Sequence, residues 1–465
     1  VVAVIGAGAA GMAAARVLSR NGIIPTVLEK EGKVGGVWNY VKNANDRPMY
    51  RGLRTNLPKE IMGYREFPWT NEFVDDGQRS YVTHRDVANY LEAYRNEFNL
   101  SRYIKHGCCI DHLKVLDNEP SLLSPPNEAW SRIRLSWRQS RDIIGDGRCE
   151  NRQAELRSDT FDAVLICNGH YARPSNPTVP GVENFDGIIM HSIQYDDPSA
   201  FKDETVLCIG GRASGSDLAR EISHHAKHVY LSDSTCHSLV NGQPQQLGNV
   251  TWVPRTIEIQ RDGSARFGDG CSVKPKVDRI ILCSGYDYAF PFINDASNLN
   301  LQCTPGERRV KPLYKQLWHA QHPNLAFVGL PHSVLPFPLF EFQAEAACAT
   351  WLQAAQDLPQ LDARMQAAED DANGGGPKAA GRVQDTHYLG SAQWDYCRDL
   401  SRISNLYDAD MEAYIATNKA IYDHSGESRK SLFPGGPDGY RSLLYTRNFV
   451  DQSFSVKEEV LEVWP

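Results

Sequence analysis

Two glycine-rich turns, at residues 6–11 and 210–215, constrain the fold of this chain more than any other feature. The first turn reads Gly-Ala-Gly-Ala-Ala-Gly and follows an apolar run at the start of the chain. A buried strand that ends in such a turn and continues into a helix is typical of a parallel sheet that binds a dinucleotide. In that arrangement Gly6 makes the tight turn, Gly8 lets a pyrophosphate approach the backbone, and Gly11 lets the helix pack on the strand. The turn therefore predicts a nucleotide site at the start of the chain.

The segments after the first turn complete this pattern. We expect a helix over 12–19, whose N-terminal amides and dipole face the phosphates, followed by a strand over 24–28. Glu29 ends that strand about twenty residues after the turn, where a carboxylate accepts hydrogen bonds from ribose hydroxyls. The predicted contacts of this first nucleotide are Gly6, Gly8, Ala9, Ala10, Gly11, Glu29 and Lys30.

The second turn departs from the pattern at one position. It reads Gly-Gly-Arg-Ala-Ser-Gly between an apolar strand over 206–209 and a helix expected over 216–222, so Arg212 stands where Gly8 stands in the first turn. A side chain there crowds a pyrophosphate, which leaves three interpretations open: Arg212 pairs with a phosphate, the affinity is weakened, or the fold has lost its ligand. The predicted contacts are Gly210, Arg212, Ala213, Ser214 and Gly215.

The strand that follows the second turn bears on the choice of nucleotide. We expect this strand over 229–231, and Asp233 comes just after it. An inward-pointing carboxylate there would repel the 2′-phosphate of NADPH. Arg212 or Lys227 could compensate, so the choice between NADPH and NADH stays open.

The two turns together predict an α/β protein with two nested Rossmann-like domains. The strand pattern of the first domain returns at 161–169, and a strand over 280–286 leads back to it after the insertion. The obvious pair of dinucleotides is a flavin and a nicotinamide, which makes the chain a redox enzyme. We assign the domains as follows: 1–170, first part of an FAD-binding domain; 171–287, inserted NADP(H)-binding domain; 288–465, second part of the FAD domain with a helical C-terminal region.

Composition excludes several other classes. The chain has 465 residues, enough for two cores, and its net charge of -8 without a Lys/Arg cluster argues against a nucleic-acid partner. No apolar stretch is long enough to cross a bilayer, and Val460–Pro465 is too short and polar for an anchor, so we expect a soluble protein. The 11 cysteines include no Cys-x-x-Cys pair, which argues against a disulfide framework, a metal site and a disulfide oxidoreductase. Secretion and a cytoplasmic location both stay open.

A rarer motif lies between the two domains. Phe185, Gly187, His191 and Tyr195 form the pattern Phe-x-Gly-x-x-x-His-x-x-x-Tyr. This pattern resembles the signature of class B flavoprotein monooxygenases, which include flavin-containing monooxygenases, N-hydroxylases and Baeyer-Villiger enzymes. The resemblance implies FAD and NADP(H) as cofactors and a role for His191 in positioning the nicotinamide. The residues alone leave two interpretations open. The spacing of four could place His191 and Tyr195 on one face of a helix, or their polar groups could only hold the connection between the domains in place.

Three further segments carry the resemblance, which extends to about Gln343. Gly35–Trp38 resembles the family's second flavin-contact loop, and Cys283–Tyr286 resembles its Ala-Thr-Gly-Tyr linker. Tyr50–Glu60 resembles the segment in which flavin-containing monooxygenases place an active-site asparagine, which Asn56 matches. The resemblance thus adds these cofactor contacts: Gly36, Val37, Trp38, Arg54, Thr55, Asn56, Ser284, Gly285, Tyr286 and Gln343.

The resemblance also implies a reaction. NADPH reduces the flavin, O₂ adds at its C4a carbon, and the hydroperoxide transfers oxygen to a soft nucleophile, an amine or a thioether. Such an intermediate needs shielding from water and a hydrogen-bond donor. The Asn56 amide donates without titrating, so Asn56 and His191 are the predicted catalytic residues. As an alternative, Asn56 is only a turn residue before Leu57–Pro58.

The expected substrate class rests on sequence similarity in two short segments rather than on the spacing of motif residues. Phe67-Pro68-Trp69 and the segment 337–341 are similar to insect members, among them soluble N-oxygenases of pyrrolizidine alkaloids. We therefore expect a tertiary-amine alkaloid or a thioether as substrate, with O₂ as co-substrate; a homo-oligomer is left open. Two other functions stay open: a Baeyer-Villiger monooxygenase, in which Arg54 stabilises the anionic peroxide, and a non-catalytic or NADPH-oxidase-like FAD-binding protein, which Arg212 favours.

Overall fold

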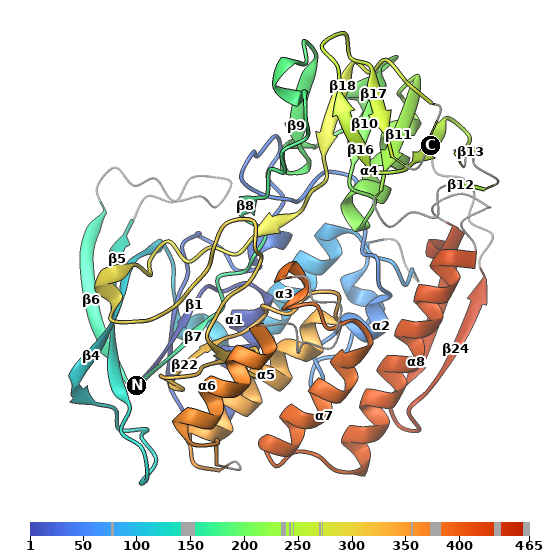
Figure 1. The fold of residues 1–465 in the computed structure, drawn as a ribbon. Coiled ribbons are helices and arrows are strands. Elements are labelled where there is room, and N and C mark those ends of the chain that lie inside the picture. Colours follow the sequence, from blue (N-terminus) through green and yellow to red (C-terminus); the bar gives the residue numbers. More distant parts are fainter. Residues whose placement is uncertain are drawn as a thin grey trace.

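The protein folds around two separate β-sheets, each covered on both faces (Figure 1). The computed structural model describes residues 1–75, 79–140, 154–233, 239–240, 243–244, 246–268, 271, 273–354, 357–372, 383–431 and 439–458. The helices in this part of the chain are α1 (Ala9–Arg20), α2 (Lys59–Met62), α3 (His84–Glu97), α4 (Ala213–Ser223), α5 (Pro336–Trp351), α6 (Leu361–Asp370), α7 (Gln393–Ile403) and α8 (Ala409–Ser431).

The first sheet begins with β1, whose residues are buried on both faces. Val2 and Val4 point into one core with α1 and α5, and Ala3 and Ile5 point into another core on the opposite face. This burial explains why β1 reads as a continuous apolar run rather than an alternating one. The strands follow the order β20 (Leu313–Tyr314), β21 (Trp318–His319), β22 (Leu325–Phe327), β7 (Ala163–Ile166), β1 (Val2–Ile5), β2 (Pro25–Leu28) and β3 (Ile104–Lys105).

The second sheet projects from the first as a separate lobe, drawn in green and yellow at the top of Figure 1. Val206 and Cys208 of its central strand pack against α4, while Leu207 packs on the other face with the hairpin of β16 (Thr256–Ile259) and β17 (Ala265–Phe267). The strands follow the order β14 (Gln246–Leu247), β15 (Val250–Val253), β11 (His228–Ser232), β10 (Thr205–Ile209), β18 (Arg279–Leu282) and β9 (Ile188–His191).

The chain crosses between the two sheets twice. The short antiparallel pair of β8 (Arg173–Pro174) and β19 (Tyr286–Asp287) joins the two crossings. The apolar pattern predicts one strand over 280–286, but β18 ends at Leu282 and β19 begins at Tyr286. Gly285 between them has φ of +78°, a left-handed conformation that interrupts the strand at the domain junction.

Two parts of the fold have no counterpart in the sequence analysis. One is the long three-stranded sheet of β4 (Cys108–Pro120), β5 (Ser131–Gln139) and β6 (Glu155–Phe161), at the left of Figure 1. The other is the hairpin of β23 (Leu443–Asn448) and β24 (Ser453–Glu458) beside α8. Elsewhere the expected elements form, with ends that shift: the helix expected over 12–19 is α1, and the helix expected over 216–222 is α4.

Within the described residues, no helix is both long and apolar enough to cross a bilayer. The end of the chain at 460–465, which the sequence argument on a membrane anchor concerns, lies outside the described residues.

Candidate functional site

The first glycine-rich turn lies at the carboxyl end of β1, between β7 and β2. Gly6 has φ of +97°, and a Cβ atom built on it would lie 2.7 Å from the carbonyl oxygen of Cys167. A Cβ on Gly11 would lie 1.9 Å from the carbonyl oxygen of Gly6. Only glycine fits these positions, and their absence of side chains lets α1 begin directly at the turn, with Ala9 and Ala10 as its first residues.

The loop Gly35–Trp38 lies beside this turn. The Gly35 amide donates to the carbonyl oxygen of Ala7 at 3.0 Å, and a Cβ built on Gly36 would lie 3.0 Å from the Cα of Gly8. Bare backbone therefore meets bare backbone at Gly8 and Gly36, a cradle that any Cβ would fill and that suits a pyrophosphate. Val37 and Trp38 continue this loop as a short 3₁₀ helix.

Glu29 joins the end of β2 to the same turn. Its side chain is buried, with Oε2 accepting from the Ala7 amide at 2.5 Å and Oε1 from the Glu31 amide at 2.8 Å. Burial raises the pKa of Glu29, while these two backbone donors lower it. Lys30, the next residue, is exposed. The carboxylate thus lies at the place where the sequence predicts a ribose contact, and its hydrogen bonds go to the chain itself.

The second turn repeats the geometry of the first. A Cβ built on Gly215 would lie 1.7 Å from the carbonyl oxygen of Gly210. Arg212 has φ -73° and ψ -167°, against -71° and -173° for Gly8, so arginine takes this position without backbone strain. Its side chain is exposed, as are Ala213 and Ser214 at the start of α4. The turn therefore keeps the shape of a nucleotide site with a cationic side chain at its mouth.

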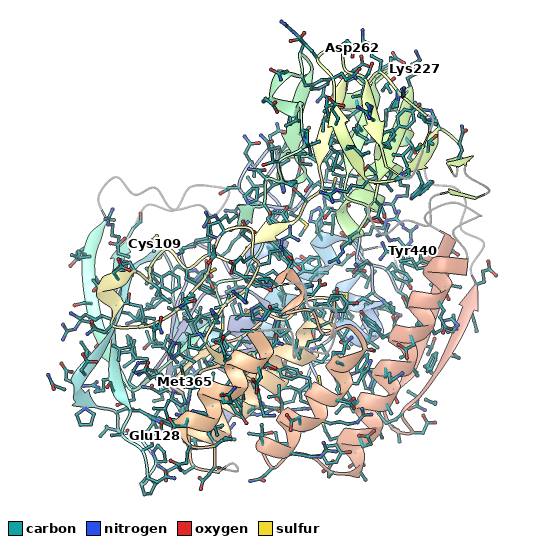
Figure 2. All side chains as sticks on the ribbon, in the orientation of Figure 1. Cys109, Glu128, Lys227, Asp262, Met365 and Tyr440 are labelled. Atoms are coloured by element: carbon teal, nitrogen blue, oxygen red, sulfur yellow. The ribbon has the colours of Figure 1, made fainter. Side chains whose placement is uncertain are left out.

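Asp233 lies against the second turn, and Lys227 does not. A Cβ built on Gly211 would lie 2.7 Å from Oδ2 of Asp233, so the carboxylate points inward. Lys227 precedes the five-residue strand β11 and Asp233 follows it, and six extended residue steps separate their backbones by about 20 Å. Figure 2 shows Lys227 at the far tip of the inserted domain. The expectation that Lys227 compensates for Asp233 is therefore wrong, because the two residues flank opposite ends of β11.

His191 holds the junction between the domains. It ends β9, so the expectation that His191 and Tyr195 share a helix face is wrong. The imidazole Nε2 donates to the carbonyl oxygen of Gly285 at 3.1 Å, and Nδ1 accepts from the Ile193 amide at 3.1 Å. These partners define a neutral tautomer with both nitrogens used, and burial lowers the pKa of His191 further. The motif histidine thus pins the linker that leads back to the first domain.

The linker itself is held from both sides. Ser284 Oγ donates to the carbonyl oxygen of Ser175 at 2.5 Å, and the Tyr286 ring meets the His191 ring edge-on at 5.4 Å. Arg308, from the loop before β20, donates to the carbonyl oxygen of Ser284. Burial lowers the pKa of Arg308, and the nearby charge of Arg212 lowers it further. Arg308 cannot be predicted from the sequence, because no motif marks a loop residue that reaches the junction only through the fold.

The segment that contains Asn56 lies along the junction. Tyr50 packs in the same core as Leu218 and Ile222 of α4. Thr55 is buried, with its amide donating to the Val82 carbonyl oxygen at 2.8 Å, and the preceding Arg54 forms a β-bridge with Thr83. Asn56 follows in a bend with an exposed side chain that makes no hydrogen bond to another residue the structure describes. Its amide is therefore available to a ligand at the junction.

Gln343 lies in the interior of α5. Its Oε1 accepts from the Gly329 amide at 2.8 Å, and its Nε2 donates to Tyr396 Oη at 3.0 Å. The side chain is fully buried. These contacts anchor α5 beneath the loop after β22, so the amide that the resemblance assigns to the flavin is engaged with the chain.

Comparison with known proteins identifies the family of this chain. A family model for FMO-like, flavin-binding monooxygenase-like proteins matches residues 1–119 and 149–246. The flavin-containing monooxygenase FMO GS-OX5 of Arabidopsis thaliana is 35% identical over 414 residues, which cover 85% of this chain and 83% of the relative. The chain belongs to the flavin-containing monooxygenase family. FMO GS-OX-like 4 of the same plant is 33% identical over 97% of this chain and 96% of its own length.

Solved structures show the same fold for this flavin-containing monooxygenase. The S-allyl-L-cysteine S-oxygenase from Allium sativum superposes with a TM-score of 0.77 at 29% identity, over 95% of this chain and 94% of that one. Tmm from a Pelagibacter strain superposes with a TM-score of 0.73 at 22% identity, over 98% and 95%. The α/β fold with two Rossmann-like sheets, predicted from the two turns, is confirmed.

FAD and NADP(H) are the cofactors of this flavin-containing monooxygenase, and its residues fit both. The backbone at Gly8 and Gly36 carries no side chain that would block a pyrophosphate, and the helix that follows presents its N-terminal amides to such a group. The second turn has the same backbone shape and adds the positive charges of Arg212 and Arg308, which suit the phosphates of NADP(H).

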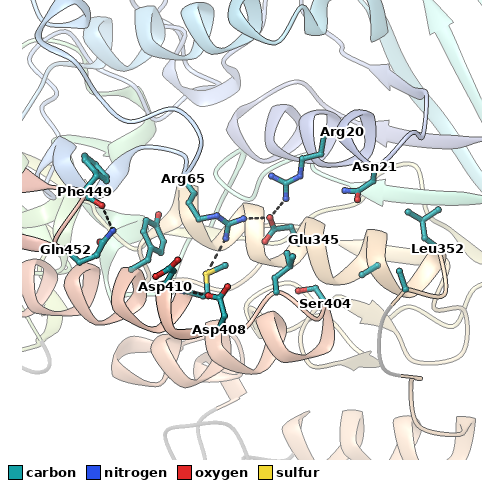
Figure 3. Close-up of a pocket in the computed structure, with 15 residues that line it drawn as sticks. Arg20, Asn21, Arg65, Glu345, Leu352, Ser404, Asp408, Asp410, Phe449 and Gln452 are labelled. Atoms are coloured by element: carbon teal, nitrogen blue, oxygen red, sulfur yellow. Dashed lines mark hydrogen bonds and ion pairs between the residues drawn. The ribbon is translucent and has the colours of Figure 1, made fainter.

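A cavity of about 630 Å³ lies elsewhere in this flavin-containing monooxygenase (Figure 3). Its walls include Arg20, Arg65 and Glu345, with both guanidinium groups paired to the Glu345 carboxylate. Arg20 ends α1, which has 12 residues and is about 18 Å long. The cavity therefore lies at the opposite end of α1 from the first nucleotide turn and is separate from the nucleotide site.

Proposed function

We propose that this flavin-containing monooxygenase uses NADPH and O₂ to transfer one oxygen atom to the sulfur of a thioether or the nitrogen of a tertiary amine. The observation that carries the proposal is the position of Asn56. Its amide, which makes no hydrogen bond to another described residue, lies on a segment that packs against both the first domain, through Val82, and the inserted domain, through α4. A donor that does not titrate at the meeting point of two nucleotide domains suits an oxygen-transfer site.

FAD, when bound, would supply the centre at which O₂ is activated, with NADPH as its reductant. The residues of the chain bind and position the two nucleotides. Asn56 donates a hydrogen bond at the reacting oxygens, and the buried Thr55 beside it keeps that donor in place. His191 acts as a positioning residue, because both of its nitrogens hold the chain and its lowered pKa keeps it neutral. A soft nucleophile attacks without a protein base, so the site needs none.

Two substrate classes follow from different observations. The similarity to the Allium sativum S-oxygenase, over 95% of this chain, favours a thioether. The segments around Phe67 and at 337–341 are similar in sequence to those of insect enzymes, which favours a tertiary amine such as a pyrrolizidine alkaloid. Both substrates present a polarisable lone pair to the same electrophilic oxygen, so one site geometry serves both.

The test is product formation by the FAD-loaded protein with NADPH and ¹⁸O₂. We expect one labelled oxygen in the sulfoxide of S-allyl-L-cysteine or in the N-oxide of a pyrrolizidine alkaloid, together with faster NADPH oxidation. Cyclohexanone serves as the third substrate, because a labelled lactone would identify a Baeyer-Villiger enzyme instead. Oxidation of NADPH that yields only hydrogen peroxide with all three compounds would contradict the proposal and identify an NADPH oxidase.

A further inference from the structure

Arg441 joins three parts of the chain that are distant in sequence. It lies in the short 3₁₀ helix Gly439–Ser442, and its side chain is only 1% exposed. Its Nε donates to the carbonyl oxygen of Thr55 at 3.2 Å, and its Nη2 lies 3.2 Å from Oδ2 and 3.3 Å from Oδ1 of Asp217. Figure 2 labels the neighbouring Tyr440 where the C-terminal part approaches the inserted domain. One buried guanidinium thus contacts both domains.

Thr55 and Asp217, both partners of Arg441, belong to the two halves of the proposed site. The Thr55 carbonyl belongs to the peptide unit whose nitrogen is that of Asn56, so its orientation sets the start of the Asn56 side chain. Asp217 lies in α4, the helix that begins at the second nucleotide turn. A guanidinium holds two acceptors at once in a fixed fork. The distance between Asn56 and the second turn is therefore defined through Arg441.

The neighbouring side chains of α4 extend this contact to the motif between the domains. Tyr195 Oη donates to Glu221 Oε2 at 2.8 Å, and Arg220 lies 3.6 Å from Asp217. A Cβ built on Gly52 would lie 2.9 Å from Glu221 Oε1, so the segment before Asn56 passes close to α4. Groups in one buried network of this kind depend on one another, because the loss of one partner leaves another buried charge uncompensated.

We propose that Arg441 is a positioning residue that couples the inserted domain to Asn56, so that the C-terminal segment completes the oxygenation site. The inference rests on the proposed function, because it concerns the placement of Asn56 in that reaction. It assigns Arg441 no contact with substrate. Its effects are on how much of the NADPH consumed ends in oxygenated product and, through Asp217 in α4, on how tightly NADP⁺ binds at the second turn.

The test compares Arg441→Met and Arg441→Lys with the FAD-loaded wild type. We expect both variants to retain FAD, while oxygenated product per NADPH falls by about tenfold and hydrogen peroxide rises, because small misplacement of reacting groups costs up to about 100-fold in rate. Lysine keeps the positive charge but cannot hold two acceptors in the fixed geometry of a guanidinium. A wild-type ratio of oxygenated product to NADPH in Arg441→Lys would show that Arg441 only compensates the charge of Asp217, and it would overturn the inference. If neither arginine variant folds, Asp217→Asn tests the same ion pair from its other partner. An unchanged ratio of oxygenated product to NADPH in Asp217→Asn would overturn the inference.

The matched control is Arg447→Met. Arg447 lies in β23, the strand that directly follows the 3₁₀ helix of Arg441, but it contacts Asn418, Gln452 and the Glu60 carbonyl rather than Thr55 and Asp217. We expect it to keep wild-type coupling; an equal loss there would indicate general destabilisation and overturn the inference. A wild type that forms no sulfoxide or N-oxide contradicts the proposed function itself. The NADP⁺ dissociation constant then still tests the contact, because equal values in wild type and Arg441→Met would overturn it.

Discussion

At the residue scale, Arg212 shows how a nucleotide turn changes its chemistry without changing its backbone. Its φ and ψ differ by only a few degrees from those of Gly8 in the first turn. The glycine at this position is required by the ligand's approach rather than by backbone conformation. The arginine side chain is exposed, and its charge lies near Arg308. These observations favour the interpretation in which Arg212 meets a phosphate.

We expect Arg212→Ala to weaken NADP⁺ binding by about tenfold, because a hydrogen bond to a charged group contributes roughly 1.5–3 kcal/mol. Isothermal titration of the FAD-loaded protein with NADP⁺ measures this. Lys227→Ala is the matched control. Lys227 lies at the end of β11 away from the second turn, so this variant should bind NADP⁺ with wild-type affinity. Equal affinities in wild type and Arg212→Ala would remove the assignment.

At the element scale, α5 carries two buried acids one turn apart. Glu341 Oε2 accepts from the Arg65 amide at 2.7 Å, while Glu345 pairs with Arg20 and Arg65 beside the cavity of Figure 3. Burial raises the pKa of Glu341 to about 7, although the charge of Arg65 opposes this shift. The helix thus contains a carboxyl group that is largely protonated at mildly acidic pH.

This shift makes stability depend on pH. The folded protein binds the Glu341 proton more tightly than the unfolded chain, so this stabilisation is complete below pH 4.5 and is lost as pH rises through about 7. The loss amounts to about 3 kcal/mol at most. We expect Glu341→Gln to flatten the pH dependence of urea unfolding between pH 5 and 8.

The exposed Glu97→Gln, at the end of α3, serves as control and should leave that dependence unchanged. A Glu341→Gln protein with the wild-type slope would show that Glu341 ionises normally in the fold.

At the scale of the whole molecule, two nucleotide turns of equal geometry lie on two sheets joined by the β8–β19 pair. Each turn has its own strand, helix and core. We therefore propose that residues 171–287 form the NADP(H)-binding unit and that the remaining residues hold FAD.

Substitution of the last glycine of each turn tests this division. A Cβ at Gly215 would meet the Gly210 carbonyl at 1.7 Å and must displace α4, an overpacking that typically costs about 1–3 kcal/mol. We expect Gly215→Ala to lose NADP⁺ affinity while it purifies with FAD, and Gly11→Ala to purify with little FAD. Loss of FAD from Gly215→Ala, read from visible absorbance, would show that the two sites do not fold independently.

Much of the fold could be predicted because local patterns encode it. Strand, turn and helix at 2–20 and 205–223 follow from apolar runs and glycines whose neighbours lie within a few residues. The strands of the β4–β6 sheet follow one another along the chain, but residues 155–159 of β6 are all exposed, so β6 lacks the alternation of apolar and polar residues that predicts a strand. The prediction for Lys227 fails because the residues between it and Asp233 form the extended strand β11, which separates two residues that are near in sequence.

The sequence by itself determined the family, the two nucleotide turns and the candidate Asn56, because each depends on residue identity within a short segment. Only the tertiary structure decided what surrounds them. In the folded chain both nitrogens of His191 are hydrogen-bonded, the amide of Gln343 is buried, and Arg308 and Arg441 lie at the domain junction. The physical reason is that a hydrogen bond or an ion pair acts over a few ångströms in space, whereas Thr55, Asp217 and Arg441 become neighbours only when both domains have folded.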